Sequence, residues 1–144
     1  MAQPIATRSD WLASHPPKSG HLKQTLAALG ARGGSGAEFQ HGVREFLDEF
    51  ALRADEGSRV AAVAEEPPPT GDPRHDAYLG ALAEHLAAVH RFDRPAWSVA
   101  PSRFLDRFWF VSDVRGFRAV AIAQAPAAFR RRGIFIPERS LHRV

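Results

Sequence analysis

The residues of this chain that could perform chemistry are histidines, carboxylates and serines, and their spacing indicates structural roles. His41 and Glu45 are four residues apart, so on a helix both could reach one metal ion, but no third ligand has the expected spacing. His85 and His90 are five residues apart. On a helix that spacing turns them about 140° away from each other, unlike the i, i+4 pair of a zinc protease motif. We therefore expect no metal site.

No nucleophile has a recognisable catalytic setting. The chain contains no cysteine, which excludes a thiolate nucleophile, and it has no G-x-S-x-G motif. Ser14, Ser98 and Ser112 lack a His and Asp arrangement in the surrounding sequence. Glu65 and Glu66 lie in a proline-rich stretch, where water would keep both carboxylates ionised. The sequence therefore predicts that the protein is not an enzyme, and it assigns no catalytic, cofactor-binding or metal-binding residue.

The clearest chemical signal is a concentration of arginine at the C-terminal end. Residues 103–144 carry nine Arg, no Lys and three Asp or Glu, a net charge of +6, whereas the whole chain of 144 residues has a net charge of +3. Such an end could bind an acidic protein surface or the phosphates of nucleic acid. Alternatively, the arginine stems cover apolar surface while their charged ends stay in water.

The elements that must position these residues are predicted to be helices. Ser35 and Glu38 form a capping box, and the helix after them has a regular apolar face. The members of that face are Phe39, Val43, Phe46, Leu47 and Phe50. Asp72 and Pro73 mark the start of a second clear helix, which should run to about His90. Leu79, Leu82, Leu86 and Val89 form its stripe, and His75, His85 and His90 lie on it.

Shorter helices are expected elsewhere in the N-terminal part. One should follow Thr7 and include Trp11, one should run from Ser19 to Gly30, and a weaker one should cover residues 58–65.

The stretch 101–137 should form the centre of the C-terminal part. Phe104, Leu105, Phe108 and Trp109 follow the spacing of one helical face, so we predict a buried aromatic helix with Arg103 on its solvent side. A platform that stacks nucleic-acid bases is the alternative role for these aromatic residues.

Residues 114–123 are then predicted to be helical, and a short helix at 126–132 should end at Gly133. An extended apolar tail, residues 134–136, should follow.

Taken together, these patterns predict an all-α protein, a compact single-domain bundle of about six to eight short helices spanning residues 1–144. The run EEPPPTGDP suggests an internal joint at residues 65–72. The absence of cysteine, of a signal peptide and of any run of about 18 apolar residues favours a cytoplasmic protein without a membrane segment.

Three segments resemble a known family. They are GAEFQHGVREFLDEFALR (residues 36–53), DPRHDAYLGALAEHLAAVHRFDRPAW (72–97) and PSRFLDRFWFVSDVRGFRAVAIAQAPAAFRRRGIFI (101–136). Together they resemble an uncharacterised family of small proteins from high-GC bacteria. The last two are also similar to the part that follows a helix-turn-helix module in antitoxin-like regulators found beside predicted nucleotidyltransferase toxins.

The resemblance implies a non-catalytic protein-interaction module of a toxin-antitoxin system, with a nucleotidyltransferase toxin as the protein partner. Such a toxin has an acidic metal site, which an arginine-rich end could cover by charge complementarity. On this hypothesis the partner-binding residues are Arg130, Arg131, Arg132, Ile134 and Phe135. Nucleic-acid binding or transcription regulation by the Arg-rich end is the alternative, although no convincing helix-turn-helix occurs at residues 20–54. No cofactor is implied.

Overall fold

Six α-helices, four short 3-10 helices and one two-stranded sheet make up residues 25–142, the part of the chain that the computed structural model describes. The mostly helical fold expected from the sequence is confirmed. The predicted helix around Trp11 and the predicted cap at Ser19 lie outside the described residues.

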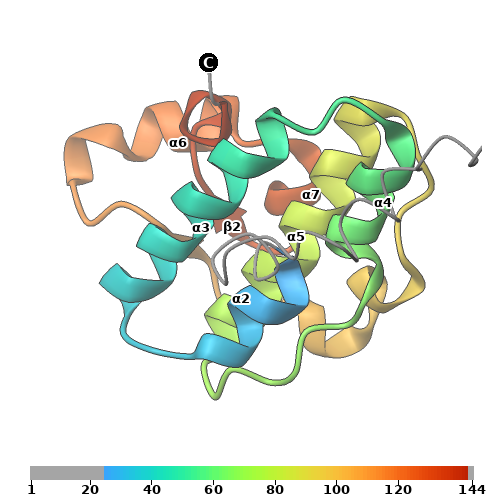
Figure 1. Cartoon of the computed structure of the whole chain (residues 1–144). Helices are drawn as coiled ribbons and strands as arrows, with labels where there is room; N and C mark the ends of the chain where they lie inside the picture. The colour runs from blue at the N-terminus through green and yellow to red at the C-terminus, as the bar shows by residue number, and fades with distance from the viewer. Residues whose placement is uncertain (1–24, 143–144) are drawn as a thin grey trace, which may run out of the picture.

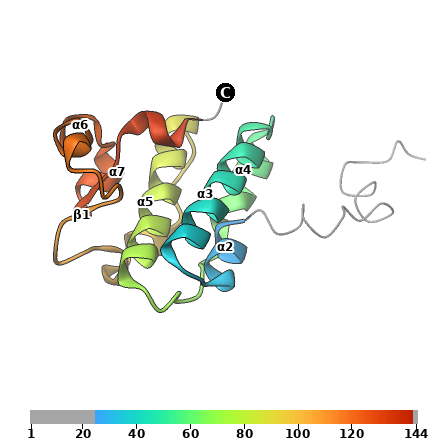
Figure 2. The same cartoon turned by 90° about the vertical axis from the view of Figure 1, so that its left-hand side faces the viewer.

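Helix α5, Pro73–His90, is the central element. Asp72 caps it by accepting a hydrogen bond from the backbone N–H of Arg74 (2.9 Å), and Pro73 occupies the first turn, as the sequence predicted. The helix is buried on most of its sides because alanine and leucine fill its faces. Val89 departs from the predicted stripe, since it is half exposed near the end of the helix. Figure 2 shows α5 between α2–α4 on one side and the C-terminal elements on the other.

Helices α2 (Leu26–Arg32), α3 (Gly36–Ala51) and α4 (Glu56–Ala64) form the first layer (Figure 1). The capping box is confirmed at its N-cap, because the Ser35 hydroxyl accepts a hydrogen bond from the Glu38 N–H (3.3 Å). The predicted apolar face of α3 is buried throughout: no member is more than 3% exposed. Its members are Phe39, Val43, Phe46, Leu47 and Phe50.

The predicted joint at residues 65–72 crosses the molecule next to α2 and α5. Pro67 within it is fully buried, and its carbonyl oxygen accepts a hydrogen bond from Arg103 (2.9 Å). The main apolar core includes residues from both sides of this segment, from Leu26 to Leu141. Residues 65–72 therefore pack against the apolar core.

The second layer consists of short elements. In chain order they are η1 (Ala96–Val99), η2 (Pro101–Arg103), β1 (Trp109–Phe110), η3 (Arg115–Phe117), α6 (Arg118–Gln124), α7 (Ala127–Arg130), β2 (Ile134–Phe135) and η4 (Glu138–Leu141). The two strands pair in parallel, with Trp109 beside Ile134 and Phe110 beside Phe135. In both views α6 lies at the side of the molecule, away from α2 and α4 (Figures 1 and 2).

Glycine is required where α5 meets η1 and η2. A Cβ atom added at Gly80 would lie 2.8 Å from the Arg103 Cβ and 2.9 Å from the Ser98 carbonyl oxygen. The missing side chain therefore lets the η1–η2 segment lie directly on the central helix.

The predicted aromatic helix at residues 104–109 is wrong. Phe104 is extended (φ −122°, ψ 141°), and Trp109 begins β1 instead. The Leu105 N–H donates to the Arg132 carbonyl oxygen (3.3 Å), and the Trp109 N–H donates to that of Gly133 (2.8 Å). The segment thus finds its backbone partners in a distant part of the chain, which overrides its helical spacing.

The predictions for the chain after β1 hold in part. Residues 114–123 begin with the 3-10 turn η3 before α6 forms, and α7 ends before Gly133, which adopts a left-handed conformation (φ +79°). The apolar tail is extended, as predicted, and forms β2.

Candidate functional site

The five predicted partner-binding residues occupy two different environments. Arg130 and Arg131 are exposed, whereas Arg132 is 1% exposed, Ile134 is fully buried and Phe135 is 9% exposed. Ile134 belongs to the main core, and Phe135 packs with Ala121 and Ala125. Only the two exposed arginines are therefore available for direct contact in this conformation.

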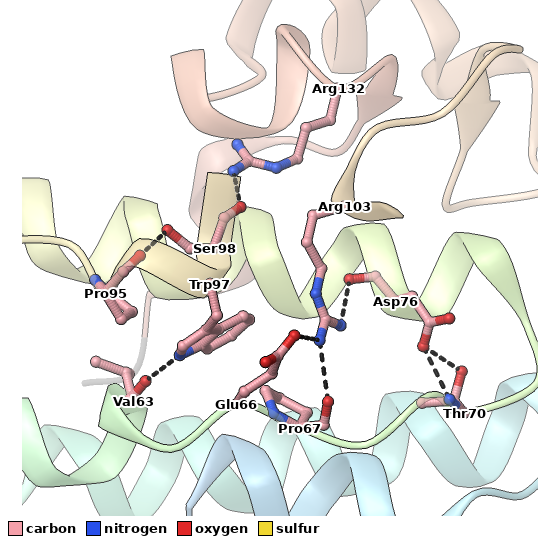
Figure 3. Close-up of polar contacts among 10 residues, drawn as sticks. All are labelled: Val63, Glu66, Pro67, Thr70, Asp76, Pro95, Trp97, Ser98, Arg103 and Arg132. Atoms are coloured by element: carbon pink, nitrogen blue, oxygen red, sulfur yellow. Dashed lines mark hydrogen bonds and ion pairs between the residues drawn. The ribbon is translucent and has the colours of Figure 1, made fainter. Parts of the chain in front are cut away.

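Arg132 fastens α7 to the η1 segment. Its guanidinium donates hydrogen bonds to the carbonyl oxygens of Ala128 (2.7 Å) and Ser98 (2.6 Å), the latter drawn in Figure 3. It also forms an ion pair with Glu84 (2.8 Å), and its Cζ lies 4.6 Å from the centroid of the Phe104 ring. Burial lowers the pKa of Arg132, while the hydrogen bond and charge of Glu84 oppose that effect.

Glu84 on α5 is the acidic centre of this cluster. It pairs with Arg131 (2.6 Å) as well as Arg132, and Arg94 lies 3.7 Å from its other oxygen. Burial alone would raise the pKa of the Glu84 carboxyl, but the hydrogen bonds from the two adjacent arginines outweigh burial and hold its pKa below the ordinary value. The lowered pKa favours the ionised carboxylate, whose single negative charge offsets part of the positive charge of the three arginines beside it.

Arg130 closes the C-terminal end of α6. One of its terminal nitrogens lies within 3.4 Å of the carbonyl oxygens of Ile122, Ala123 and Ala125. Carbonyls at a helix C-terminus have no partner within the helix, and a cation there is favourable. The side chain is exposed, but one of its terminal nitrogens already serves the fold.

Arg103, which was predicted to face solvent, is instead 3% exposed. It donates to the carbonyl oxygens of Asp76 (3.2 Å) and Pro67 (2.9 Å), lies 3.5 Å from Glu66, and places its Cζ 4.9 Å from the centre of the Trp97 ring (Figure 3). The error follows from the wrong helix, because Arg103 ends the 3-10 helix η2, which lies on α5, and does not belong to a long helix with a solvent side. Arg103 and Arg132 therefore fasten the two ends of the η1–η2 segment.

The histidines on α5 have structural surroundings. His75 stacks on Phe39 with 4.0 Å between the ring centroids, and burial lowers its pKa despite the nearby carboxylate of Asp72. His85 is buried against Phe129, and burial lowers its pKa as well. Burial therefore favours the neutral form of both rings.

His41 and Glu45, which the sequence placed on one helical face, form a surface pair: the His41 Nε2 lies 2.9 Å from the carboxylate, and both side chains reach solvent. Within residues 25–142 no group of three His, Asp or Glu side chains is arranged to hold a metal ion.

The serines considered as nucleophiles have other roles. The Ser98 hydroxyl is buried and donates to the Pro95 carbonyl oxygen (2.7 Å), as Figure 3 shows. The Ser112 hydroxyl accepts a hydrogen bond from the Val114 N–H (3.2 Å). Ser14 lies outside the described residues.

A broad hollow of about 910 Å³ lies between α2 and the proline-rich segment. Alanine and proline supply half of its lining residues, and Glu66, Asp76 and Arg103 among its polar residues have partners in the fold. Asp76 accepts hydrogen bonds from the N–H and hydroxyl of Thr70 (2.9 and 2.8 Å), and Arg103 is held as described above. The hollow therefore shows no converging reactive groups.

Exposed large apolar side chains are concentrated in one segment of the second layer. Among the described residues, seven large hydrophobic side chains are exposed, and four of them lie within residues 108–122. These four are Phe108 (79%), Val114 (54%), Phe117 (49%) and Ile122 (49%). Together with Arg107, Arg115 and Arg118 they are here called the α6 surface.

The arginines of the α6 surface differ from those of the Glu84 cluster. In the part of the chain that the structure describes, none of the three forms an ion pair with a carboxylate, although Asp106 and Asp113 lie nearby in sequence. Arg118 lies over the Phe110 ring at 5.1 Å, so its charge remains available at the surface. Sequence reasoning missed this surface because it placed Phe108 in a buried helix and gave the helical stretch 114–123 no outward-facing role. The mixture of apolar residues with Arg at 114–122 was the signal that could have revealed it.

Comparison with protein-family models, curated proteins and solved structures finds no match to this chain. In residues 25–142 no helix has the length and apolar character needed to cross a membrane.

Proposed function

We propose that this chain is a non-catalytic protein-interaction module that binds an acidic partner protein through the α6 surface. The observation that carries the proposal is the gathering of four exposed large apolar side chains in one 15-residue segment beside arginines that lack an acidic partner in the described chain. Exposed apolar groups of this kind mark interaction sites, and aromatic residues and arginine are enriched at such sites.

A protein partner accounts for the composition of the α6 surface better than nucleic acid does. Val114 and Ile122 are aliphatic and exposed, and they suit apolar pockets on a protein. Nucleic-acid binding remains the second outcome that the experiment must be able to detect.

The sequence resemblance supplies the identity of the partner within this proposal. An antitoxin-like protein would bind the nucleotidyltransferase toxin encoded beside it, covering an acidic metal site with the arginines of the α6 surface. Arg130 and Arg131 would lie at the rim of the contact. Arg132, Ile134 and Phe135 would support it from within, because they hold the strands and α7 in place.

The test is co-expression of the chain with the protein encoded by the neighbouring gene, followed by copurification and calorimetry of the complex. Phe117→Glu and Arg118→Glu should each weaken the complex at least tenfold while the circular dichroism spectrum stays unchanged. Leu52→Glu is the matched control, since Leu52 is also exposed (83%) but lies beyond α3, away from the α6 surface.

Three outcomes would contradict parts of the proposal. A complex that tolerates both α6 substitutions would refute this surface as the contact. Failure to copurify with the neighbouring protein would refute the toxin as partner. A steeply salt-dependent shift of a labelled duplex or RNA, weakened by Arg118→Glu, would favour the nucleic-acid alternative.

A further inference from the structure

A small cavity of about 250 Å³ opens between α6 and η4, next to the α6 surface. Phe110, Phe117 and Phe135 contribute its aromatic walls, and Arg118, Arg139 and Ser140 bring polar groups to it. Phe110 and Phe135 come from the two strands. Phe117 and Arg118 come from η3 and α6, and Arg139 and Ser140 come from η4. The cavity is therefore formed by residues that come together only in the folded chain.

The aromatic walls are ordered by contacts with one another. The Phe110 and Phe135 rings stack with 5.1 Å between centroids and an angle of 27° between planes, and Phe108 meets Phe135 edge-on at 5.3 Å. The parallel pairing of β1 with β2 fixes the first two rings, since they stand directly opposite each other. A planar ring entering the cavity would thus find a preformed aromatic surface.

The polar groups of the cavity are cationic and hydroxylic. Arg118 lies over the Phe110 ring, and Arg139 lies on η4 on the other side of the opening. In residues 25–142 neither arginine forms an ion pair with a carboxylate. Glu138, the nearest acid to Arg139 in sequence, lies 3.7 Å from the His142 Nε2. Two cations beside an aromatic cavity complement a ligand with a ring and a negative charge.

The geometry points to a binding site for a small aromatic carboxylate. The volume limits the ligand to one or two rings, because pockets for drug-sized molecules start at roughly 300 Å³. The ring of the ligand packs against the aromatic walls of the cavity, while its carboxylate accepts hydrogen bonds from Arg118 and Arg139. This inference goes beyond the proposed function, since it requires no partner protein.

The test uses the isolated full-length chain and 2-naphthoate as the probe, with binding followed by amide chemical shifts in a two-dimensional NMR titration. Saturable shifts should map to residues around Phe110, Phe117 and Ser140. Arg118→Gln and Arg139→Gln should each weaken binding by about tenfold, the effect of losing one hydrogen bond to a charged group. Arg107→Gln is the matched control, because Arg107 is exposed nearby but does not line the cavity.

Neutral and ringless probes complete the design. 2-Naphthylmethanol, which keeps the rings but lacks the charge, should bind at least tenfold more weakly than 2-naphthoate, and acetate should not give saturable shifts. Equal binding of the neutral probe, shifts that map elsewhere, or an equal loss in Arg107→Gln would each overturn the inference. All of these outcomes are independent of whether a partner protein binds the α6 surface.

Discussion

Replacing Glu84 with glutamine should destabilise the protein far more than its position near the surface suggests. The substitution removes the negative charge that faces Arg131 and Arg132 at 2.6 and 2.8 Å. Arg132 has no exposed side-chain surface, so water cannot take over the lost interaction. The variant would leave a buried cation without a counter-charge.

The structure sets the size of the effect. Removing one partner of a buried ion pair costs about 3–5 kcal/mol. The lower end applies, because Arg132 keeps its hydrogen bonds to the Ala128 and Ser98 carbonyl oxygens and the amide oxygen of the introduced glutamine could still accept one from it. A loss of about 3 kcal/mol corresponds to a fall in Tm of roughly 10 °C in a chain of this length.

The assay is urea denaturation followed by circular dichroism, with the slope of unfolding free energy against urea checked for constancy. Arg131→Gln is the control, because Arg131 also bonds Glu84 but is 43% exposed and should cost less than about 1 kcal/mol. The double variant Glu84→Gln with Arg132→Met should lose less than the sum of the two single variants, because the uncompensated charge is gone. A cost below about 1 kcal/mol for Glu84→Gln, or an equal cost for Arg131→Gln, would refute the reasoning.

Three further predictions concern stability. Gly80→Ala should cost about 1–3 kcal/mol in urea denaturation, because its methyl group would overlap the backbone at Ser98; a neutral effect would show that η1 does not lie on α5. Gly133→Ala should cost about 1–2 kcal/mol, measured in the same way, because φ is +79° there; an increase in stability would contradict that conformation. Burial lowers the pKa of His75 and His85 below 6.5, so the unfolded chain binds more protons and the unfolding free energy should decrease as pH falls below 6.5; urea titrations that show no loss of stability between pH 7 and 5 would argue against neutral buried rings.

The sequence predicted best where local signals and burial agree. Helix α3 has a capping serine at its start and a regular apolar face, and α5 has Asp72 and Pro73 at its start, so both could be located from spacing alone. Local rules decide such helices, because each cap and apolar stripe lies within the helix itself.

The errors occurred where distant residues decide the structure. The segment from Phe104 to Trp109 has helical spacing, but its backbone pairs with residues 132–135. Arg103 and Arg132 are buried because carbonyl groups 36 and 34 residues away accept their hydrogen bonds. A charged side chain carries no local sign of such partners, so the sequence placed Arg103 in solvent and offered Arg132 as a contact.

The parallel pairing of β1 and β2 has a consequence for how the protein could diverge. Parallel neighbours need a crossover connection, and here residues 111–133 supply it, with η3, α6 and α7 inside. Surface connections tolerate sequence change better than the elements they join. The binding specificity could therefore change through substitutions at the outward-facing residues of this crossover connection, while the helices that support it stay the same.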